Sequence, residues 1–354
     1  METESNIVAE TAERIFADLA DAQTINADHA GSWKAPLWQA LTEAGLPLSW
    51  VAEECGGAGA SLADGFAVLN AAGRAALPAP LAETMLAGWL LAQAGMASPD
   101  TAMTVAPAHP KDRIALGADG RLTGRARGVP FAQEAKHIAV LAHGDNGAVV
   151  ALVDAAAPRI AEGAGLGGDA SDVVVFDAVT PLQTAPAPRG FDQTALMLMG
   201  CVVRSLQIAG SLESLLAISV AYANQRVAFE KKIGQFQAVQ HNLAKLAGET
   251  SAALAAATSA ADAICSAASF DDAVFLEAAA AKIRCAEAAE KGAAIAHQVH
   301  GAIGFTEEHI LHRYSLRALG WRDDFGSESH WAVELGRLVA GRGADDLWPL
   351  VASR

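Results

Sequence analysis

Long alanine-rich stretches in the second half of the chain constrain its fold more than any other feature. Residues 192–226 run without a proline, and residues 234–268 and 272–301 continue the same alanine-rich pattern of apolar residues. Apolar residues at intervals of three and four mark helices that bury one face, and long consecutive helices pack as an antiparallel bundle. We therefore predict a C-terminal helical bundle, completed by a further helix after residue 327.

The first 190 residues divide into two regions of different composition. Residues 1–100 show helical apolar spacing, with a helix stop at Gly45 and a plausible helix cap at Ser61. Residues 101–190 instead hold short β-branched runs separated by Gly, Asp and Pro, which is typical of an antiparallel β-domain. The predicted fold class is α+β and multidomain. It has an N-terminal helical domain over 1–100, a middle antiparallel β-domain over 101–190, and a C-terminal four-helix-bundle domain over 191–354.

The charge balance limits the partners of this chain. Its formal net charge is −15 and its pI is about 5.0, which argues against nucleic acid or an anionic membrane as the main partner. The four cysteines form no CxxC pair and the ten histidines show no ligand spacing, so we predict no metal site. The N-terminus is acidic and amphipathic, unlike a signal peptide, and the apolar run around residues 86–97 is too short to span a bilayer. These features predict a cytoplasmic protein.

Three segments carry a resemblance to a known family. Residues 37–74 form a helix–loop region with an acidic pair before Gly-Gly, residues 226–240 read RVAFEKKIGQFQAVQ, and residues 298–313 read QVHGAIGFTEEHILHR. In this order, and flanking a β-rich middle, they resemble the flavin-dependent acyl-CoA dehydrogenases over nearly the whole chain. The resemblance implies the fold of that family, FAD as the cofactor and an acyl-CoA thioester as the substrate.

The same resemblance implies which residues meet the cofactor. An arginine fork can hold the dianionic diphosphate of FAD, and glycines let the backbone approach a ligand closely. The cofactor-binding residues implied are Arg226, Phe229, Ile233, Gln237, Gln298, Gly301, Gly304 and Ser327. The chain departs from the family pattern at Glu230 and Ala302, where relatives carry glycine. The alternative is that Arg226 caps a helix and that the glycine segment is an ordinary turn between helices.

The catalytic base of the family is missing from its expected position. Aligned from Gly304 without gaps, Gly326 and Ser327 match the Gly-Thr that follows the family's glutamate, and Phe325 takes the place of the glutamate. Some relatives carry the base on the long helix before Arg226, but the equivalent stretch near Gly200 has no carboxylate.

Three acids close to Phe325 are alternative bases. They are Asp323, Asp324 and Glu328, and each lies within a few residues of the expected position. Acids at this place also suit the start of a helix, because a carboxylate interacts favourably with the helix dipole and Ser327 is a good N-cap.

A second family element is also missing. Relatives bring a Thr-Glu-Pro…Gly-Ser stretch to the flavin ring, whereas residues 104–124 contain nothing of that type and the middle domain is shortened. The chain therefore resembles the non-base-bearing subunit of heteromeric bacterial dehydrogenases of the steroid side-chain type. This resemblance implies a sister subunit as a partner and electron-transfer flavoprotein, or a similar protein, as the electron acceptor.

Two other functions are open from the sequence. One is a self-sufficient homo-oligomeric dehydrogenase whose base is one of the three acids, and the other is a non-enzymatic helical scaffold or CoA-thioester binder.

Overall fold

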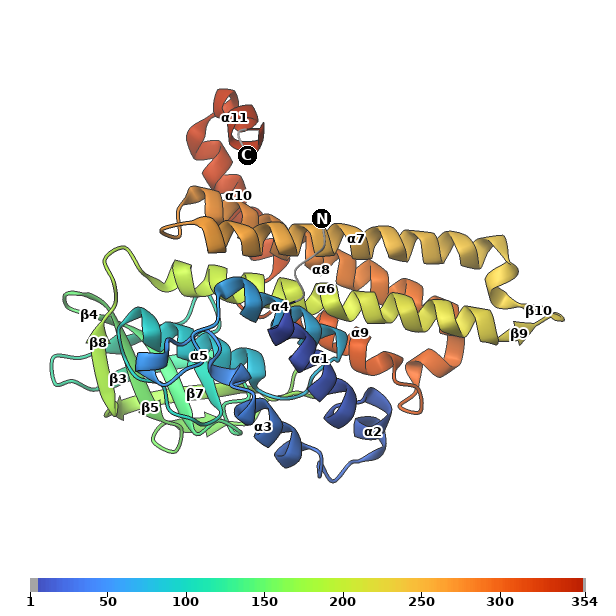
Figure 1. Ribbon diagram of the computed structural model, residues 1–354. Helices are drawn as coiled ribbons and strands as arrows, with labels where there is room; N and C mark the ends of the chain where they lie inside the picture. Colours follow the sequence, from blue (N-terminus) through green and yellow to red (C-terminus); the bar gives the residue numbers. More distant parts are fainter. Residues whose placement is uncertain (1–5, 353–354) are drawn as a thin grey trace.

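The computed structural model describes residues 6–352 and comprises three parts (Figure 1). The first is a group of helices that lies along one side of the C-terminal bundle. Ser61 begins α4 with a capping box, because its side chain accepts a hydrogen bond from Asp64 N while the Asp64 carboxylate accepts one from Ser61 N. This confirms the cap predicted at Ser61. The helices of this part are α1 (Ile7–Leu19), α2 (Ala22–Ala27), α3 (Lys34–Glu43), α4 (Leu62–Arg74) and α5 (Leu81–Gln93).

The second part is an eight-stranded sheet with its own apolar core. Its strand order is β6-β7-β3-β2-β4-β5-β8, with β1 paired to β4. Most pairs are antiparallel as predicted, but β1 and β2 both pair with β4 in parallel, so the sheet is mixed. The strands are β1 (Met103–Ala106), β2 (Arg113–Leu116), β3 (Leu122–Pro130), β4 (His137–Gly144), β5 (Gly147–Asp154), β6 (Arg159–Ala161), β7 (Ser171–Val179) and β8 (Gln183–Pro186).

The third part is the predicted helical bundle. Its three long helices lie side by side, and α10 packs against α8 as the expected helix after residue 327 (Figure 1). A short helix that the sequence reading did not separate, α9, packs against both α6 and α8. The helices are α6 (Gln193–Gln225), α7 (Gln237–Ser266), α8 (Asp272–His300), α9 (Leu311–Trp321), α10 (Glu328–Arg342) and α11 (Leu347–Ala352); a small hairpin of β9 (Val227–Ala228) and β10 (Lys231–Lys232) joins α6 to α7.

Helix α6 is the central element of the molecule. It crosses α4 closely: a Cβ added at Gly73 would stand 2.2 Å from Gln207 O, and one added at Gly210 would stand 2.2 Å from Asn70 O. Within residues 6–352 it alone has the length and apolar composition to cross a bilayer, and its most apolar window is entirely buried inside the protein. It is therefore the helix around which the other parts pack.

Candidate active site

The turn between α9 and α10 holds a phenylalanine in an unusual conformation. Phe325 is fully buried and has a φ of 56°, in the left-handed region that non-glycine residues rarely adopt. Three hydrogen bonds fix its backbone: its N–H donates to Ala108 O (3.1 Å), and its carbonyl accepts from Cys201 Sγ (3.3 Å) and Trp331 Nε1 (3.1 Å). Ala108 follows β1, in the stretch where relatives carry their flavin-ring segment. The β-domain therefore supports the Phe325 turn.

The ring of Phe325 packs directly on Gly200 of α6. A Cβ added at Gly200 would stand only 2.3 Å from Phe325 Cγ, so the glycine leaves the space that the ring occupies. Position 325 and the region of Gly200 are the two positions at which the family resemblance predicts a base. They are in contact in the structure, and neither a phenyl ring nor a glycine can accept a proton.

A buried ion network surrounds this contact. The Arg204 guanidinium lies 2.6 Å from Glu83 Oε1, 2.9 Å from Asp324 Oδ2 and 2.6 Å from Gln207 Oε1. It also lies 5.8 Å from the centre of the Phe325 ring. Burial by itself would lower the pKa of Arg204, but Glu83 and Asp324 outweigh burial and raise that pKa. The network therefore holds Asp324 as an ion-pair partner.

Lys282 of α8 stabilises the same turn through hydrogen bonds to its backbone. It is fully buried, and its ammonium donates to the backbone carbonyls of Trp321 and Asp324, each at 2.7 Å. Burial lowers the pKa of Lys282 and raises the pKa of the nearby Cys201 thiol to about 12. A cation that binds the last carbonyls of α9 also interacts favourably with the helix dipole.

The acids around Phe325 occupy distinct positions. Asp324 is held by Arg204, and Glu328 lies 3.1 Å from Arg322 Nη2 in the first turn of α10. Ser327 is the N-cap of α10 and accepts from His330 N at 3.3 Å. Asp323 is exposed at the rim of a cavity. The structure thus gives Asp324 and Glu328 ion-pair partners and leaves Asp323 facing solvent.

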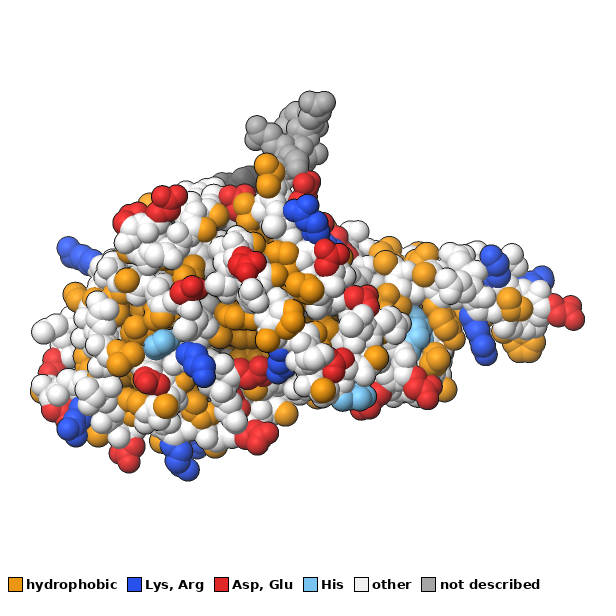
Figure 2. All heavy atoms as spheres, turned by 60° about the horizontal axis from the view of Figure 1, so that its bottom comes forward, with side chains coloured by type: hydrophobic (Ala, Val, Ile, Leu, Met, Phe, Trp, Pro, Cys, Tyr) orange, Lys and Arg blue, Asp and Glu red, His pale blue; other side chains and the backbone are white. Residues whose placement is uncertain are grey.

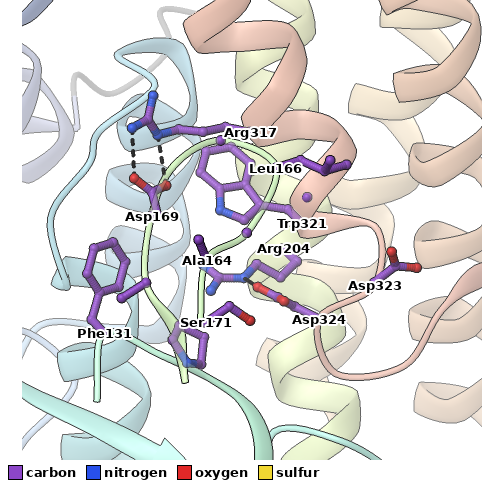
Figure 3. A pocket seen from close by; sticks show the side chains of 15 residues that line it. Phe131, Ala164, Leu166, Asp169, Ser171, Arg204, Arg317, Trp321, Asp323 and Asp324 are labelled. Atoms are coloured by element: carbon purple, nitrogen blue, oxygen red, sulfur yellow. Dashed lines mark hydrogen bonds and ion pairs between the residues drawn. The ribbon is translucent and has the colours of Figure 1, made fainter. Parts of the chain in front are cut away.

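Figure 3 shows the cavity of about 320 Å³ beside this turn. Its walls come from the end of β3, the glycine-rich loop over residues 163–170, and α9 with the following turn. Arg317 and Asp169 close one side through two hydrogen bonds of 2.8 and 2.7 Å. The labelled side chains lining it are Phe131, Ala164, Leu166, Asp169, Ser171, Arg204, Arg317, Trp321, Asp323 and Asp324.

The residues implied for the FAD dinucleotide lie at the opposite end of α6. Arg226 ends α6 and is exposed, as is Gln237 at the start of α7. Phe229 is 90% exposed at the tip of the β9–β10 hairpin, where Phe229 and Glu230 both have a positive φ. In Figure 2 this protruding end carries Lys and Arg side chains around hydrophobic ones. Ile233, in the same connection, is half-buried.

The glycine segment lies beside that end. Tyr222 stacks on His300 with ring centres 4.4 Å apart and donates a hydrogen bond to His300 O (3.3 Å). Gln298, Gly301 and Gly304 line an open cavity of about 750 Å³ after His300. Gly301 has a φ of 65°, a backbone conformation that favours glycine. The space around it is open, since nothing lies within 4 Å of a Cβ built on it.

Ser327 is distant from the other predicted cofactor residues. Its neighbour Phe325 contacts Gly200, whereas Arg226 lies 26 residues further along α6, which is roughly 39 Å at 1.5 Å per helical residue. Within one chain, the predicted set therefore forms two separate groups.

Comparison with known proteins gives the family. Residues 2–98 match the acyl-CoA dehydrogenase N-terminal domain, and residues 190–327 match the acyl-CoA dehydrogenase C-terminal domain. The chain is also 28% identical to "Acyl-CoA dehydrogenase IpdE2" of Mycobacterium tuberculosis, over 98% of both chains. This chain belongs to the acyl-CoA dehydrogenase family. The prediction of the family and of its fold is confirmed.

Solved acyl-CoA dehydrogenase structures have the same architecture. The ChsE4-ChsE5 complex from Mycobacterium tuberculosis superposes with a TM-score of 0.86 at 24% identity, covering 97% of this chain and 99% of that one. The Tcur3481-Tcur3483 steroid acyl-CoA dehydrogenase, a G363A variant, gives a TM-score of 0.82 at 27% identity, with 94% and 97% covered.

FAD is the cofactor of the acyl-CoA dehydrogenases, as predicted. The distal end of α6 carries an exposed cation, Arg226, beside the open glycine Gly301, and an arginine guanidinium suits an anionic group such as a diphosphate.

The sequence analysis did not predict the buried ion network. One sequence feature indicates it: Arg204 is the only charge in the apolar run LMLMGCVVRSLQIAG, and a charge buried in such a helix needs polar partners.

Proposed function

We propose that this chain is one subunit of a hetero-oligomeric, FAD-dependent acyl-CoA dehydrogenase. It contributes contacts to the dinucleotide half of FAD, while a sister subunit supplies the catalytic carboxylate. One observation supports the proposal: Phe325, which the sequence resemblance aligns with the family's glutamate, is buried and packs on Gly200.

The reaction explains why this observation matters. In the reaction of this family a carboxylate takes the α-proton of an acyl-CoA thioester, and FAD, when bound, would supply the acceptor for the β-hydrogen as hydride. A positioned general base contributes typically about 10²- to 10⁴-fold in rate. Asp324 and Glu328 are both engaged in ion pairs, and the Phe325 backbone is fixed by three hydrogen bonds. The turn therefore has little freedom to present another acid.

The separation of the two groups of residues supports a shared cofactor. A subunit that has no base at its own Phe325 turn can still contact FAD bound in a partner subunit through the distal end of α6, where Arg226 lies. Two of the similar solved structures, the ChsE4-ChsE5 complex and Tcur3481-Tcur3483, are each named for two different chains. By analogy, the substrate of this chain's complex is a steroid-type acyl-CoA thioester. Its electrons pass to an electron-transfer flavoprotein or a similar acceptor in the cytoplasm.

A self-sufficient dehydrogenase would depend on Asp323. It is the candidate base that is exposed beside the cavity of Figure 3. In the subunit proposal an Asp323→Asn change leaves acyl-CoA oxidation by the complex within about twofold. In the self-sufficient enzyme the same change would lower the rate of acyl-CoA oxidation by about 10²-fold or more.

Coexpression tests the proposal. The chain purified alone is expected to be colourless or weakly yellow and unable to oxidise an acyl-CoA. Coexpressed with a sister subunit that carries the glutamate, it forms a yellow, active complex. A yellow chain that oxidises acyl-CoA by itself overturns the proposal, and so does a chain that stays colourless and inactive with every sister subunit.

A further inference from the structure

Arg313, in the first turn of α9, is a half-buried cation that forms no ion pair with the residues that the structure describes. Its Nε–H is buried and donates to no acceptor in the described part of the chain, and none of the ion pairs among residues 6–352 includes Arg313. The segment Leu311–Arg313 holds no acid, so the positive end of the helix dipole adds to the charge of the guanidinium. A half-buried charge in this setting is costly unless an anion pairs with it.

The three acids that line the same cavity as Arg313 already have other partners. Asp169 receives two hydrogen bonds from Arg317, at 2.8 and 2.7 Å. Glu134 lies 2.9 Å from Lys34 Nζ. The Asp28 carboxylate accepts from Ser32 Oγ at 2.6 Å and from two backbone N–H groups at 2.9 and 3.0 Å. These contacts leave no local carboxylate dedicated to Arg313.

The electrostatic setting of Arg313 agrees with this geometry. Burial lowers the pKa of Arg313 to about 10, and repulsion from Arg317 adds to the effect. An arginine nevertheless stays protonated at neutral pH. The charge is therefore retained, and Asp169, which Arg317 already pairs with, offsets it only in part.

Arg313 faces a cavity of about 240 Å³ at the meeting point of all three parts of the molecule. The loop between α2 and α3 contributes His29 and Trp33, the β-domain contributes Phe131 and the Gly167–Asp169 segment, and α9 contributes the arginines. This cavity shares Phe131, Gly167, Asp169 and Arg317 with the one in Figure 3.

We propose that this second cavity is a binding site for a small oxyanion, a phosphate or carboxylate group held by the Arg313 guanidinium. The planar fork of arginine matches two oxygens of such a group, and partial burial strengthens the pairing. A bound oxyanion would contact the N-terminal helices, the β-domain and α9 together, and would stabilise their packing. The site does not depend on the function proposed above.

Phosphate titration of the full-length chain tests this site. The unfolding temperature is measured against inorganic phosphate, and separately against acetate, with chloride keeping the ionic strength constant. For the wild type we expect a saturable rise with phosphate, acetate or both, since a ligand that binds only the folded state stabilises it. Arg313→Gln should weaken that binding about 10- to 100-fold, and Arg313→Lys should weaken it less, because the charge stays but the fork is lost.

Arg159→Gln is the matched control, because it removes an exposed arginine and the same unit charge. It should leave the phosphate response unchanged. In buffer free of oxyanions, Arg313→Gln should unfold at the same temperature as the wild type or higher, since it removes an unpaired charge. The site is refuted if the wild type shows no saturable response, if Arg313→Gln responds like the wild type, if Arg159→Gln also loses the response, or if Arg313→Gln is less stable without oxyanion.

Discussion

The two ends of α6 differ in how deeply their side chains are buried and in whether their charges are paired. At one end, Gly200 and Phe325 are packed together with a buried ion network around them. At the other, Arg226 and Phe229 are exposed and an open glycine segment lies beside them. The first end packs side chains of its own chain beside a cavity of about 320 Å³, whereas the second exposes its side chains.

The Phe325 turn is part of the core, so we expect substitutions there to change stability. The distal end contributes little to the core, so we expect substitutions at its exposed Arg226 to change binding rather than stability. Substitutions at the two ends should therefore have opposite consequences.

The largest effect is expected from breaking the buried ion network. Arg204→Met leaves Glu83 and Asp324 without their cation, which typically costs about 3–5 kcal/mol of unfolding free energy. Chemical denaturation measures it. The matched change is Arg337→Met, in an exposed pair with Glu334, which should cost less than about 1 kcal/mol. Equal costs would show that the Arg204 network is not a buried structural element.

A smaller effect is expected from Gly200→Ala. The added methyl group would collide with the Phe325 ring, and overpacking of this kind costs typically about 1–3 kcal/mol. The control is Gly248→Ala in α7, where nothing lies within 4 Å, so the change should stabilise the helix by up to about 1 kcal/mol. A double variant with Phe325→Leu should recover part of the loss. If it recovers none, the two residues are not coupled.

Acid should destabilise the distal end. Burial lowers the pKa of His297 and His300 below the ordinary value of 6.5. The unfolded chain therefore binds more protons than the folded chain below about pH 6.5, and stability falls as pH falls. The unfolding temperature should drop by about 2 °C or more between pH 7.5 and 5.5. The double variant His297→Gln/His300→Gln should drop less, whereas exposed His241→Gln should behave like the wild type.

The smallest effect on stability is expected from Arg226→Ala. Arg226 is exposed, so the unfolding free energy should change by less than about 0.5 kcal/mol. FAD affinity of the reconstituted complex should nevertheless fall about tenfold or more, because a charge-assisted contact to the diphosphate is lost. Flavin absorbance per mole of complex gives the readout. Unchanged flavin occupancy would remove Arg226 from the cofactor site.

The sequence was informative where local pattern decides structure. Long alanine-rich runs predicted the bundle, and Ser61 predicted a helix cap. The motifs around Arg226 and Gly301 identified the family. What the sequence could not give were contacts between distant segments. The packing of Phe325 on Gly200 joins residues 125 positions apart, and the partners of Arg204 come from α5 and the α9–α10 turn. Neither follows from local propensity, because each depends on how three domains meet.

The flavin content of the purified hetero-oligomer tests the central claim most directly. If this chain's Phe325 end holds no catalytic site and its Arg226 end completes the partner's site, one FAD is expected for each pair of unlike chains. Flavin absorbance after release from the denatured complex, divided by the amount of each chain, measures this ratio. A ratio of one FAD for every chain, this one included, would contradict the account.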